Sequence, residues 1–220
     1  EEAIKSSLQE KETLLAEIHH RVKNNLAVVS GMMQLQAFDS DNSELQAKLY
    51  DSVVRIKTMA TVHELLYQSN SFSQLEFSDT LDKLAKNISE TLQIGTQISL
   101  DIHCEPIKLN INQAIPASLI VNEVLTNAYK HAFTDTNSGN IDFRLTEKDG
   151  LIEILISDNG VGFSNKDIMN SGSLGMHLIK VLSDQLSAEH NYKNTDDGTV
   201  FKLHFERQET KKGIGNANLN

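Results

Sequence analysis

The sequence predicts an α+β protein in which a helical hairpin precedes an α/β sandwich. Over residues 4–38 and 45–66, apolar side chains recur every three or four positions, which is the period of an amphipathic helix. After residue 75, helical patterns alternate with short strands that flank Gly-containing turns. Helices combined with mostly antiparallel strands favour a sandwich with its helices on one face of a sheet.

The hairpin is expected from two helices joined by a short connection. The first helix covers 4–38, a stretch without proline, and its apolar seam consists of Ile4, Leu8, Leu15, Ile18, Val22, Val29 and Met32. The turn-forming segment 38–44 ends it, and a second seam follows at Leu45, Leu49, Ile56, Met59 and Leu66. Because each helix has one apolar stripe, a single hairpin has a poor core, and we expect a homodimer that forms a four-helix bundle.

We divide the chain into a hairpin domain over 1–70, a second domain over 75–206 and a disordered tail over 207–220, with a polar linker at 67–74. The second domain is expected to hold helices over 77–92, 112–133 and 174–186 and strands over 97–104, 140–147, 151–158, 188–194 and 199–205. Ser78 is the candidate N-cap of its first helix, and Pro116 is expected in the first turn of the next. The segments KDG and TDDG indicate two β-hairpins.

The net charge, the single cysteine and the lengths of the apolar runs exclude several classes of function. The chain has 220 residues, with 20 Lys and Arg against 30 Asp and Glu and a net charge of −10, which argues against non-specific nucleic-acid binding. Cys104 is the single cysteine, which excludes an internal disulfide and a cysteine metal cluster, and a reducing, cytoplasmic location is expected. No apolar run reaches the roughly 20 residues of a membrane-spanning helix. Because the sequence begins at Glu1, we expect a fragment or processed form of a longer protein.

The segment SDNGVGF places Asp158 at the end of a predicted strand, followed by Gly160 and Gly162. A carboxylate there accepts a hydrogen bond from an exocyclic amine such as that of adenine, and the glycines let backbone approach a ligand closely. Thr199, after the glycine of DDGTVF, is in a position to support such a pocket with its hydroxyl. A simple Asp-Asn-Gly turn is the equally open alternative.

The segment SGSLGMHL adds Gly172 and Gly175 just before a helix. Backbone amides at a helix N-terminus favour phosphate. A flexible loop followed by a capped helix is the alternative interpretation of this segment.

The segment NEVLTNAYKHAF places Glu123 and Asn127 four residues apart, on one face of a helix, with Lys130 and His131 one turn further on. A neutral amide oxygen suits Mg²⁺ that keeps its waters and bridges phosphates. The alternative is an exposed polar helix face.

The segment EIHHRVKNN sets His19 and His20 side by side in the first helix. At about 100° per residue, His20 lies about 200° from Ile18 and Val22 and points away from the seam, whereas His19 flanks it. Asn24, one turn after His20, shares the outward face. Only the outward histidine is placed to meet a second domain or protein.

Taken together and in this order, these motifs resemble the Bergerat ATP-binding fold of gyrase-type ATPases and sensor histidine kinases. EIHHRVKNN in an upstream hairpin is similar to the phosphoacceptor segment of the HisKA_2 subclass, close to the HWE kinases. The resemblance covers residues 10–206. It implies ATP and Mg²⁺ as cofactors and a response-regulator receiver domain as partner.

The resemblance also implies roles for single residues. Asn127 would hold Mg²⁺, Asp158 would read adenine, and His20 would be the phosphoacceptor. The nucleotide would be lined by Gly160, Gly162, Gly172 and Gly175, with Lys130 and His131 approaching phosphates. Arg21 and Lys23 would offset charge on the phosphorylated helix, and Asn24 would orient a hydrolytic water.

The sequence departs from the commonest kinases at two positions. Glu123 stands where they usually carry Asn, and it resembles the water-activating base of the hydrolysing relatives. Arg21 stands where they usually carry an acidic residue, so the general base is left open. The lid segment, Ser164–Ser171, is short. The sequence also allows two other functions: an ATPase with Glu123 as the general base, and a non-catalytic nucleotide-binding scaffold.

Overall fold

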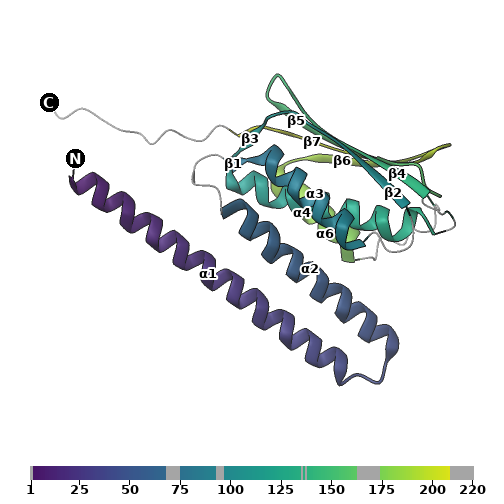
Figure 1. Ribbon diagram of the computed structural model, residues 1–220, viewed down its shortest axis with the longest axis horizontal. Coiled ribbons are helices and arrows are strands. Elements are labelled where there is room, and N and C mark those ends of the chain that lie inside the picture. Colours follow the sequence, from purple (N-terminus) through teal and green to yellow (C-terminus); the bar gives the residue numbers. More distant parts are fainter. Residues whose placement is uncertain are drawn as a thin grey trace. The chain divides into compact units, whose positions relative to one another are not determined.

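The computed structural model describes residues 2–67, 75–92, 97–134, 136, 138–162 and 174–208. The chain divides into two compact units, Glu1–Asn70 and Ser71–Asn220 (Figure 1). The expected linker residues 68–74 and the lid segment lie outside the described residues. Among the described residues, no helix is both long enough and apolar enough to cross a bilayer.

The first unit is a hairpin of two long helices, α1 (Glu2–Phe38) and α2 (Ser43–Tyr67). The connection is short because Asn42 begins the second helix: its Oδ1 accepts hydrogen bonds from the backbone N–H groups of Glu44 and Leu45 at 3.0 and 3.1 Å. These bonds satisfy N–H groups of the first turn that have no partner within the helix. The predicted hairpin is therefore confirmed.

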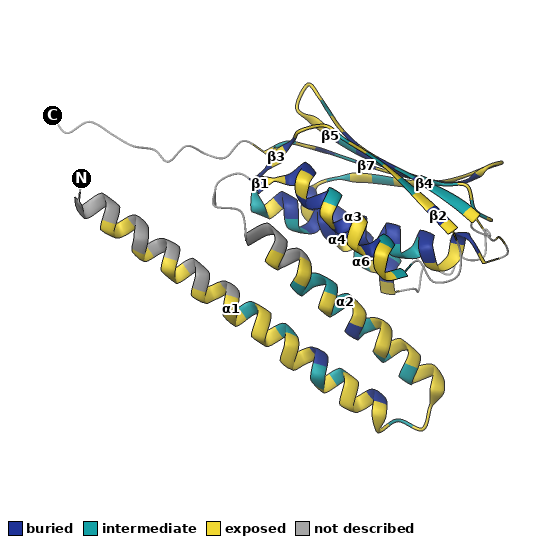
Figure 2. Cartoon of the chain, in the orientation of Figure 1, coloured by how far each residue is buried: buried dark blue, intermediate teal, exposed yellow. Residues whose placement is uncertain are grey.

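The apolar surface of α1 differs from the single seam expected from the sequence. The covered positions are spaced by three or four residues: Ser30 and Ala37 are buried, and Val22, Leu26 and Met33 are half-buried. Val29 and Met32, by contrast, are 43% and 59% exposed. Figure 2 shows that much of the described part of α1 is exposed. One partner helix covers only one stripe of α1, so the apolar residues beside that stripe stay in water.

The second unit is built on a five-stranded sheet with the order β2-β4-β5-β7-β6. Its strands are β2 (Gln97–Cys104), β4 (Ser138–Lys148), β5 (Leu151–Asp158), β6 (Glu189–Thr195) and β7 (Gly198–Glu206). Strands β2 and β4 are parallel, whereas the other neighbouring pairs are antiparallel. A two-residue ladder joins β1 (Leu75–Glu76) to β3 (Lys108–Leu109).

Helices cover one face of this sheet, as the sequence predicts. They are α3 (Phe77–Leu92), α4 (Ile111–Asn127) with the π-helical turn η1 (Ala128–Ala132), and α6 (Leu174–Leu186) (Figure 1). Alternate residues of each inner strand point into the core, for example Ile152, Ile154 and Ile156 of β5, all buried. The α/β sandwich is therefore confirmed.

Both expected β-hairpins are present. Asp149 and Gly150 join β4 to β5 with φ values of 54° and 81°, the left-handed pair of a type I′ turn, which matches the twist of the strands. Asp196 and Asp197 join β6 to β7.

One helix start and the places of two single residues differ from expectation. Helix α4 begins at Ile111, because Asn110 is its N-cap and accepts from Gln113 N at 3.1 Å, so Pro116 lies in the second turn and not the first. Helix α3 begins at Phe77, so Ser78 lies inside it and is not its N-cap. The N–H groups of Phe77 and Ser78 donate to the carbonyl of Ile107, which replaces a side-chain cap. Gly175 lies in the first turn of α6 and not before it.

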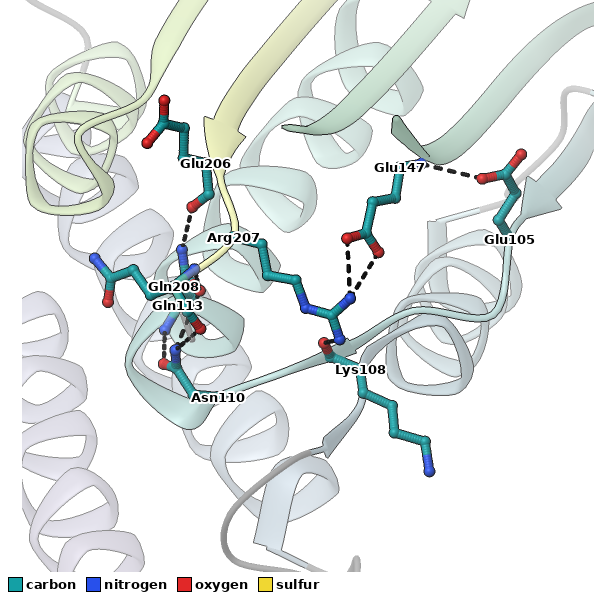
Figure 3. A network of polar contacts seen from close by, with 8 residues as sticks. All are labelled: Glu105, Lys108, Asn110, Gln113, Glu147, Glu206, Arg207 and Gln208. Atoms are coloured by element: carbon teal, nitrogen blue, oxygen red, sulfur yellow. Dashed lines mark hydrogen bonds and ion pairs between the residues drawn. The ribbon is translucent and has the colours of Figure 1, made fainter. Parts of the chain in front are cut away.

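The tail does not begin at Arg207, where the sequence suggested disorder. The guanidinium of Arg207 donates to both carboxylate oxygens of Glu147 at 2.9 Å and to the carbonyl of Lys108 at 2.7 Å (Figure 3). The N–H of Gln208 donates to Gln113 Oε1 at 2.9 Å. Polar side chains alone suggested a solvated tail, but these two residues have specific partners from distant segments. Residues 209–220 lie outside the described residues.

Candidate active site

The face of α4 that carries Glu123 and Asn127 is not an exposed polar surface. Glu123 is 4% exposed and Asn127 is half-buried. The π-helical turn that follows carries Lys130 and His131, which are both exposed. Turns of this kind are rare and often occur at functional sites. The helix thus presents one buried carboxylate, one half-buried amide and, one turn on, two exposed basic groups.

Asp158 ends β5 directly opposite Thr199 of β7. Its Oδ1 accepts hydrogen bonds from the backbone N–H groups of Gly160 at 3.0 Å and Thr199 at 3.4 Å. Burial raises the pKa of this carboxyl, and the hydrogen bonds from Gly160 and Thr199, including the Thr199 side chain, lower it in part. The group is therefore a half-buried hydrogen-bond acceptor held in one orientation.

The loop after Asp158 is fastened to the end of the α4 helix. Val161 N donates to the carbonyl of Ala132 at 2.8 Å, and a Cβ at Gly160 would overlap that same carbonyl. Gly162 has a φ of 72° in the left-handed region, which favours glycine. A glycine at 160 is therefore required by the close approach of two backbones.

Asn159 fixes the other side of the loop. Its side-chain oxygen accepts from Asn140 N at 2.7 Å, and its N–H donates to Asn140 O at 3.2 Å. The Asp-Asn-Gly segment is thus more than a surface turn, because it connects β4, β5 and the π-helical turn.

Tyr192 on β6 was not singled out from the sequence, yet it lies among the predicted site residues. It pairs with Phe201 of β7, with ring centroids 4.7 Å apart. Burial and the nearby carboxylates of Glu123 and Asp158 raise the pKa of its hydroxyl well above the ordinary range. The structure therefore places this phenol near Glu123 and Asp158.

A signal for Tyr192 does exist in the sequence. Alternate residues of β6 share a face, and the strand alternates between exposed and half-buried positions from Glu189 to Lys193. Tyr192 is thereby on the inward face, and the pairing of β6 with β7 shows that its ring meets Phe201.

On the hairpin, His20 is exposed, as are Arg21 and Asn24. Arg21 Nε donates to Glu17 Oε1 at 2.8 Å on the same helix. Lys23 Nζ donates to both oxygens of Glu64 on α2 at 2.9 Å. Both cations near His20 therefore already have carboxylate partners. The side chain of His19 lies outside the described residues.

The remaining predicted site residues divide in two. Thr199 and Gly175 are buried. Gly172 lies outside the described residues. Among the described residues there is no cluster of three or more His, Cys, Asp or Glu side chains fit to hold a metal. The Asn127 side chain offers an amide oxygen, a donor that Mg²⁺ accepts together with ligand oxygens.

A helix-covered sheet with a fixed carboxylate at a strand end, following a hairpin with an exposed histidine, is the arrangement of a histidine-kinase-like ATPase domain attached to a phosphoacceptor hairpin. Comparison with protein families agrees. Residues 17–92, which reach the end of α3, match the HisKA_2 histidine kinase family, and residues 100–205 match the histidine kinase-like ATPase domain. The chain belongs to the histidine kinases.

Individual relatives support this assignment. The sensor histidine kinase PdtaS of Mycobacterium tuberculosis is 27% identical over 178 residues, which cover 80% of this chain and 35% of PdtaS. Blue-light-activated histidine kinase 2 of Erythrobacter litoralis is 28% identical, covering 90% of this chain and 58% of that protein. The chain thus spans about a third of one relative and over half of the other.

A solved structure shows the same arrangement of elements. The histidine kinase domain of the Erythrobacter litoralis EL346 blue-light activated kinase superimposes with a TM-score of 0.66 at 27% identity. The match covers 92% of this chain and 94% of that one.

Proposed function

We propose that this chain is the transmitter core of a sensor histidine kinase, which transfers the γ-phosphoryl group of ATP to His20 and then to an aspartate of a response-regulator receiver domain. The observation that carries the proposal is the half-buried carboxylate of Asp158, held at the end of β5 by the N–H groups of Gly160 and Thr199, in a chain that also has an exposed His20. The match of residues 17–92 to a histidine kinase family supports the phosphoacceptor role, and the match of residues 100–205 to the ATPase domain supports the use of ATP.

ATP is the proposed substrate of the second unit. Asp158 accepts from the exocyclic amine of adenine, and Thr199, which fixes the carboxylate, supports the pocket. Gly160 and Gly162 line the nucleotide, together with Gly172 and Gly175 at the other loop. The exposed Lys130 and His131 approach the phosphates from the π-helical turn.

Asn127 is the residue proposed to hold Mg²⁺. A bound Mg²⁺ would offset charge that develops during phosphoryl transfer. The protein's own part would be to present an amide oxygen, and the half-buried Asn127, one turn after the buried Glu123 on α4, fits that requirement.

His20 is the proposed nucleophile. A neutral imidazole nitrogen forms the N–P bond in line with the breaking bond to the β,γ-bridging oxygen, and ADP leaves. Imidazole is substantially neutral near physiological pH. Because Arg21 and Lys23 are paired with carboxylates, they lie beside the phosphorylated helix as parts of ion pairs, and Asn24 is exposed where a hydrolytic water would need orientation.

The assembly and location follow the same proposal. We place the dimer interface on the hairpin, residues 4–66, because apolar side chains of α1 are exposed in the single chain. We place the core in the cytoplasm, where ATP and response regulators are found.

A second candidate is an ATPase in which Glu123 activates water. The observation that favours it is the burial of this carboxylate beside Asn127, since a shielded carboxylate next to a Mg²⁺ ligand suits a general base. An ATPase would release inorganic phosphate without forming a phosphorylated protein. A nucleotide-binding scaffold would produce neither free phosphate nor phosphorylated protein.

The test uses labelled ATP with two matched variants, His19→Gln and His20→Gln. His20→Gln should bind nucleotide and lose all acid-labile label, whereas His19→Gln should keep label at a reduced rate or with reduced stability. Label that persists on His20→Gln contradicts the assignment. Phosphate release without any label on the wild type favours the ATPase, and neither product favours the scaffold.

A further inference from the structure

An ion pair between the two helices of the hairpin lies one turn from the proposed phosphoacceptor. Lys23 Nζ of α1 contacts both carboxylate oxygens of Glu64 on α2 at 2.9 Å. The ion pair of Arg21 with Glu17, by comparison, joins residues four apart on one helix. Glu64 is 41 positions from Lys23 in the sequence, so this contact depends on the packing of α1 against α2.

Lys23 is also a surface neighbour of His20. Residues three apart on a helix have Cβ atoms roughly 5–6 Å apart, whereas consecutive residues do not face each other. Lys23 follows His20 by three positions, and Arg21 follows it directly. The flexible four-carbon stem of a lysine lets its ammonium group reach a group carried by the neighbouring imidazole. One cation is therefore within reach of two acceptors, the Glu64 carboxylate and a phosphoryl group on His20.

The two acceptors differ in charge. A carboxylate carries one negative charge, whereas a phosphoryl group carries about 1.5 to 2 near pH 7 and has three strong acceptor oxygens. The side chains of Lys23 and Glu64 are 51% and 45% exposed, and an ion pair in contact with water costs little to break. Phosphorylation of His20 is therefore expected to draw the Lys23 ammonium group away from Glu64.

We propose that Glu64 is a positioning residue for Lys23: it holds the ammonium group at the contact between α1 and α2 while His20 is unmodified, and it competes with the phosphoryl group for that cation after transfer. This inference rests on the proposed function, because it assumes that His20 is the phosphoacceptor. The covalent step is unchanged, and only the partner of Lys23 differs before and after it. Glu64 thereby makes the phosphohistidine less stable relative to ATP, which favours onward transfer of the phosphoryl group.

Glu64→Gln in the full chain removes the charge and keeps the length and the helix propensity of the side chain. The measured quantity is the equilibrium constant of autophosphorylation, obtained from acid-labile label at several ratios of ADP to labelled Mg·ATP. We expect an increase of about two- to fivefold, the size of one exposed ion pair, because Lys23 no longer has a competing carboxylate. Far-UV circular dichroism verifies that the helix content is that of the wild type.

Glu44→Gln is the matched control. It removes the same charge from the same hairpin, and Glu44 likewise belongs to an exposed ion pair, with Lys48 at 2.6 Å. Glu44 lies in the first turn of α2, at the opposite end of that helix from Glu64. The equilibrium constant of this variant should equal that of the wild type, and an increase as large as in Glu64→Gln would contradict a specific role for Glu64.

A double-mutant cycle separates competition for Lys23 from simple repulsion between Glu64 and the phosphoryl group. Lys23→Gln should lower the equilibrium constant, and Glu64→Gln should have no further effect in that background. An undiminished increase in the Lys23→Gln background, or an unchanged constant in Glu64→Gln alone, would overturn the proposal. A wild-type protein that forms no acid-labile label contradicts the proposed function itself, which is a different outcome and removes this inference with it.

Discussion

At the scale of single residues, Asp158 combines two opposed effects. Burial raises the pKa of its carboxyl, whereas hydrogen bonds from Gly160 and Thr199 lower it, and burial is the larger effect. The folded protein therefore holds this proton more tightly than the unfolded chain does. Its contribution to stability is complete at low pH and is lost as the pH rises through the ordinary aspartate range toward the raised pKa. A group that costs stability at neutral pH is retained for a reason other than folding.

Asp158→Asn is expected to abolish ATP binding while the protein remains folded, with a thermal unfolding temperature at pH 7 equal to or above the wild type. The amide keeps an acceptor for Gly160 and Thr199 but carries no charge to bury. Calorimetry and thermal unfolding measure the two effects. The control is Asp101→Asn, at an exposed position of β2, which should leave ATP affinity unchanged.

In the wild type, ATP affinity should fall on acidification at a pH above that of an ordinary aspartate, because the ionised carboxylate is the proposed acceptor for adenine. Unchanged ATP affinity in Asp158→Asn would refute the adenine assignment.

At the scale of elements, the end of β7 is fastened to two distant segments. Arg207 connects Glu147 of β4 with the carbonyl of Lys108 in β3 (Figure 3). The N–H of Gln208 then reaches Gln113 in the first turn of α4, whose side chain donates in turn to the carbonyl of Glu206 at 2.8 Å. These contacts stabilise the edge of the domain where β3 pairs with β1.

Arg207→Ala is expected to lower the free energy of unfolding by about 1–3 kcal/mol, because it removes a half-buried ion pair and leaves a carbonyl without its donor. Urea denaturation measures this change. Arg144→Ala is the matched control: its ion pair with Asp142 joins residues two apart on one strand, and the Arg144 side chain is 59% exposed.

The control should cost no more than about 1 kcal/mol, as for exposed pairs in general. An equal loss of stability in the two variants contradicts a specific role for Arg207.

At the scale of the whole molecule, the hairpin has apolar surface that one copy of the chain leaves in water. Val29, Met32, Leu35 and Phe38 of α1 are between 43% and 81% exposed. Contiguous apolar surface of this kind on a helix marks an interface. A two-fold dimer would bury the same stripe on both copies.

Val29→Glu should convert the proposed dimer of the full chain into a monomer, because it places a charge in that stripe. Light scattering with size exclusion measures the molar mass. Val181→Glu is the matched control, since Val181 of α6 is 48% exposed against 43% for Val29, and it should leave the mass unchanged. A wild-type chain that is monomeric at all concentrations refutes the dimer.

The sequence by itself determined the order of elements, the hairpin and the one-sided sandwich, and it proposed the segments of the candidate site. These are local properties: helical and strand periods, turn residues and motif spacing depend on neighbours in the chain. Asp158 at a strand end and Glu123 one turn before Asn127 could be predicted in this way.

Only the tertiary structure decided which of these groups meet. The pairing of β6 with β7 brings Tyr192 to Phe201, and the approach of Ala132 to Gly160 fixes the loop. Contacts between distant segments also explain why the predictions for Ser78 and Arg207 were wrong. Ser78 needs no capping role because the Ile107 carbonyl supplies the hydrogen bonds, and Arg207 is ordered because Glu147 and Lys108 lie beside it. Such contacts join residues tens of positions apart, and no local pattern in the sequence encodes which partner a side chain will find.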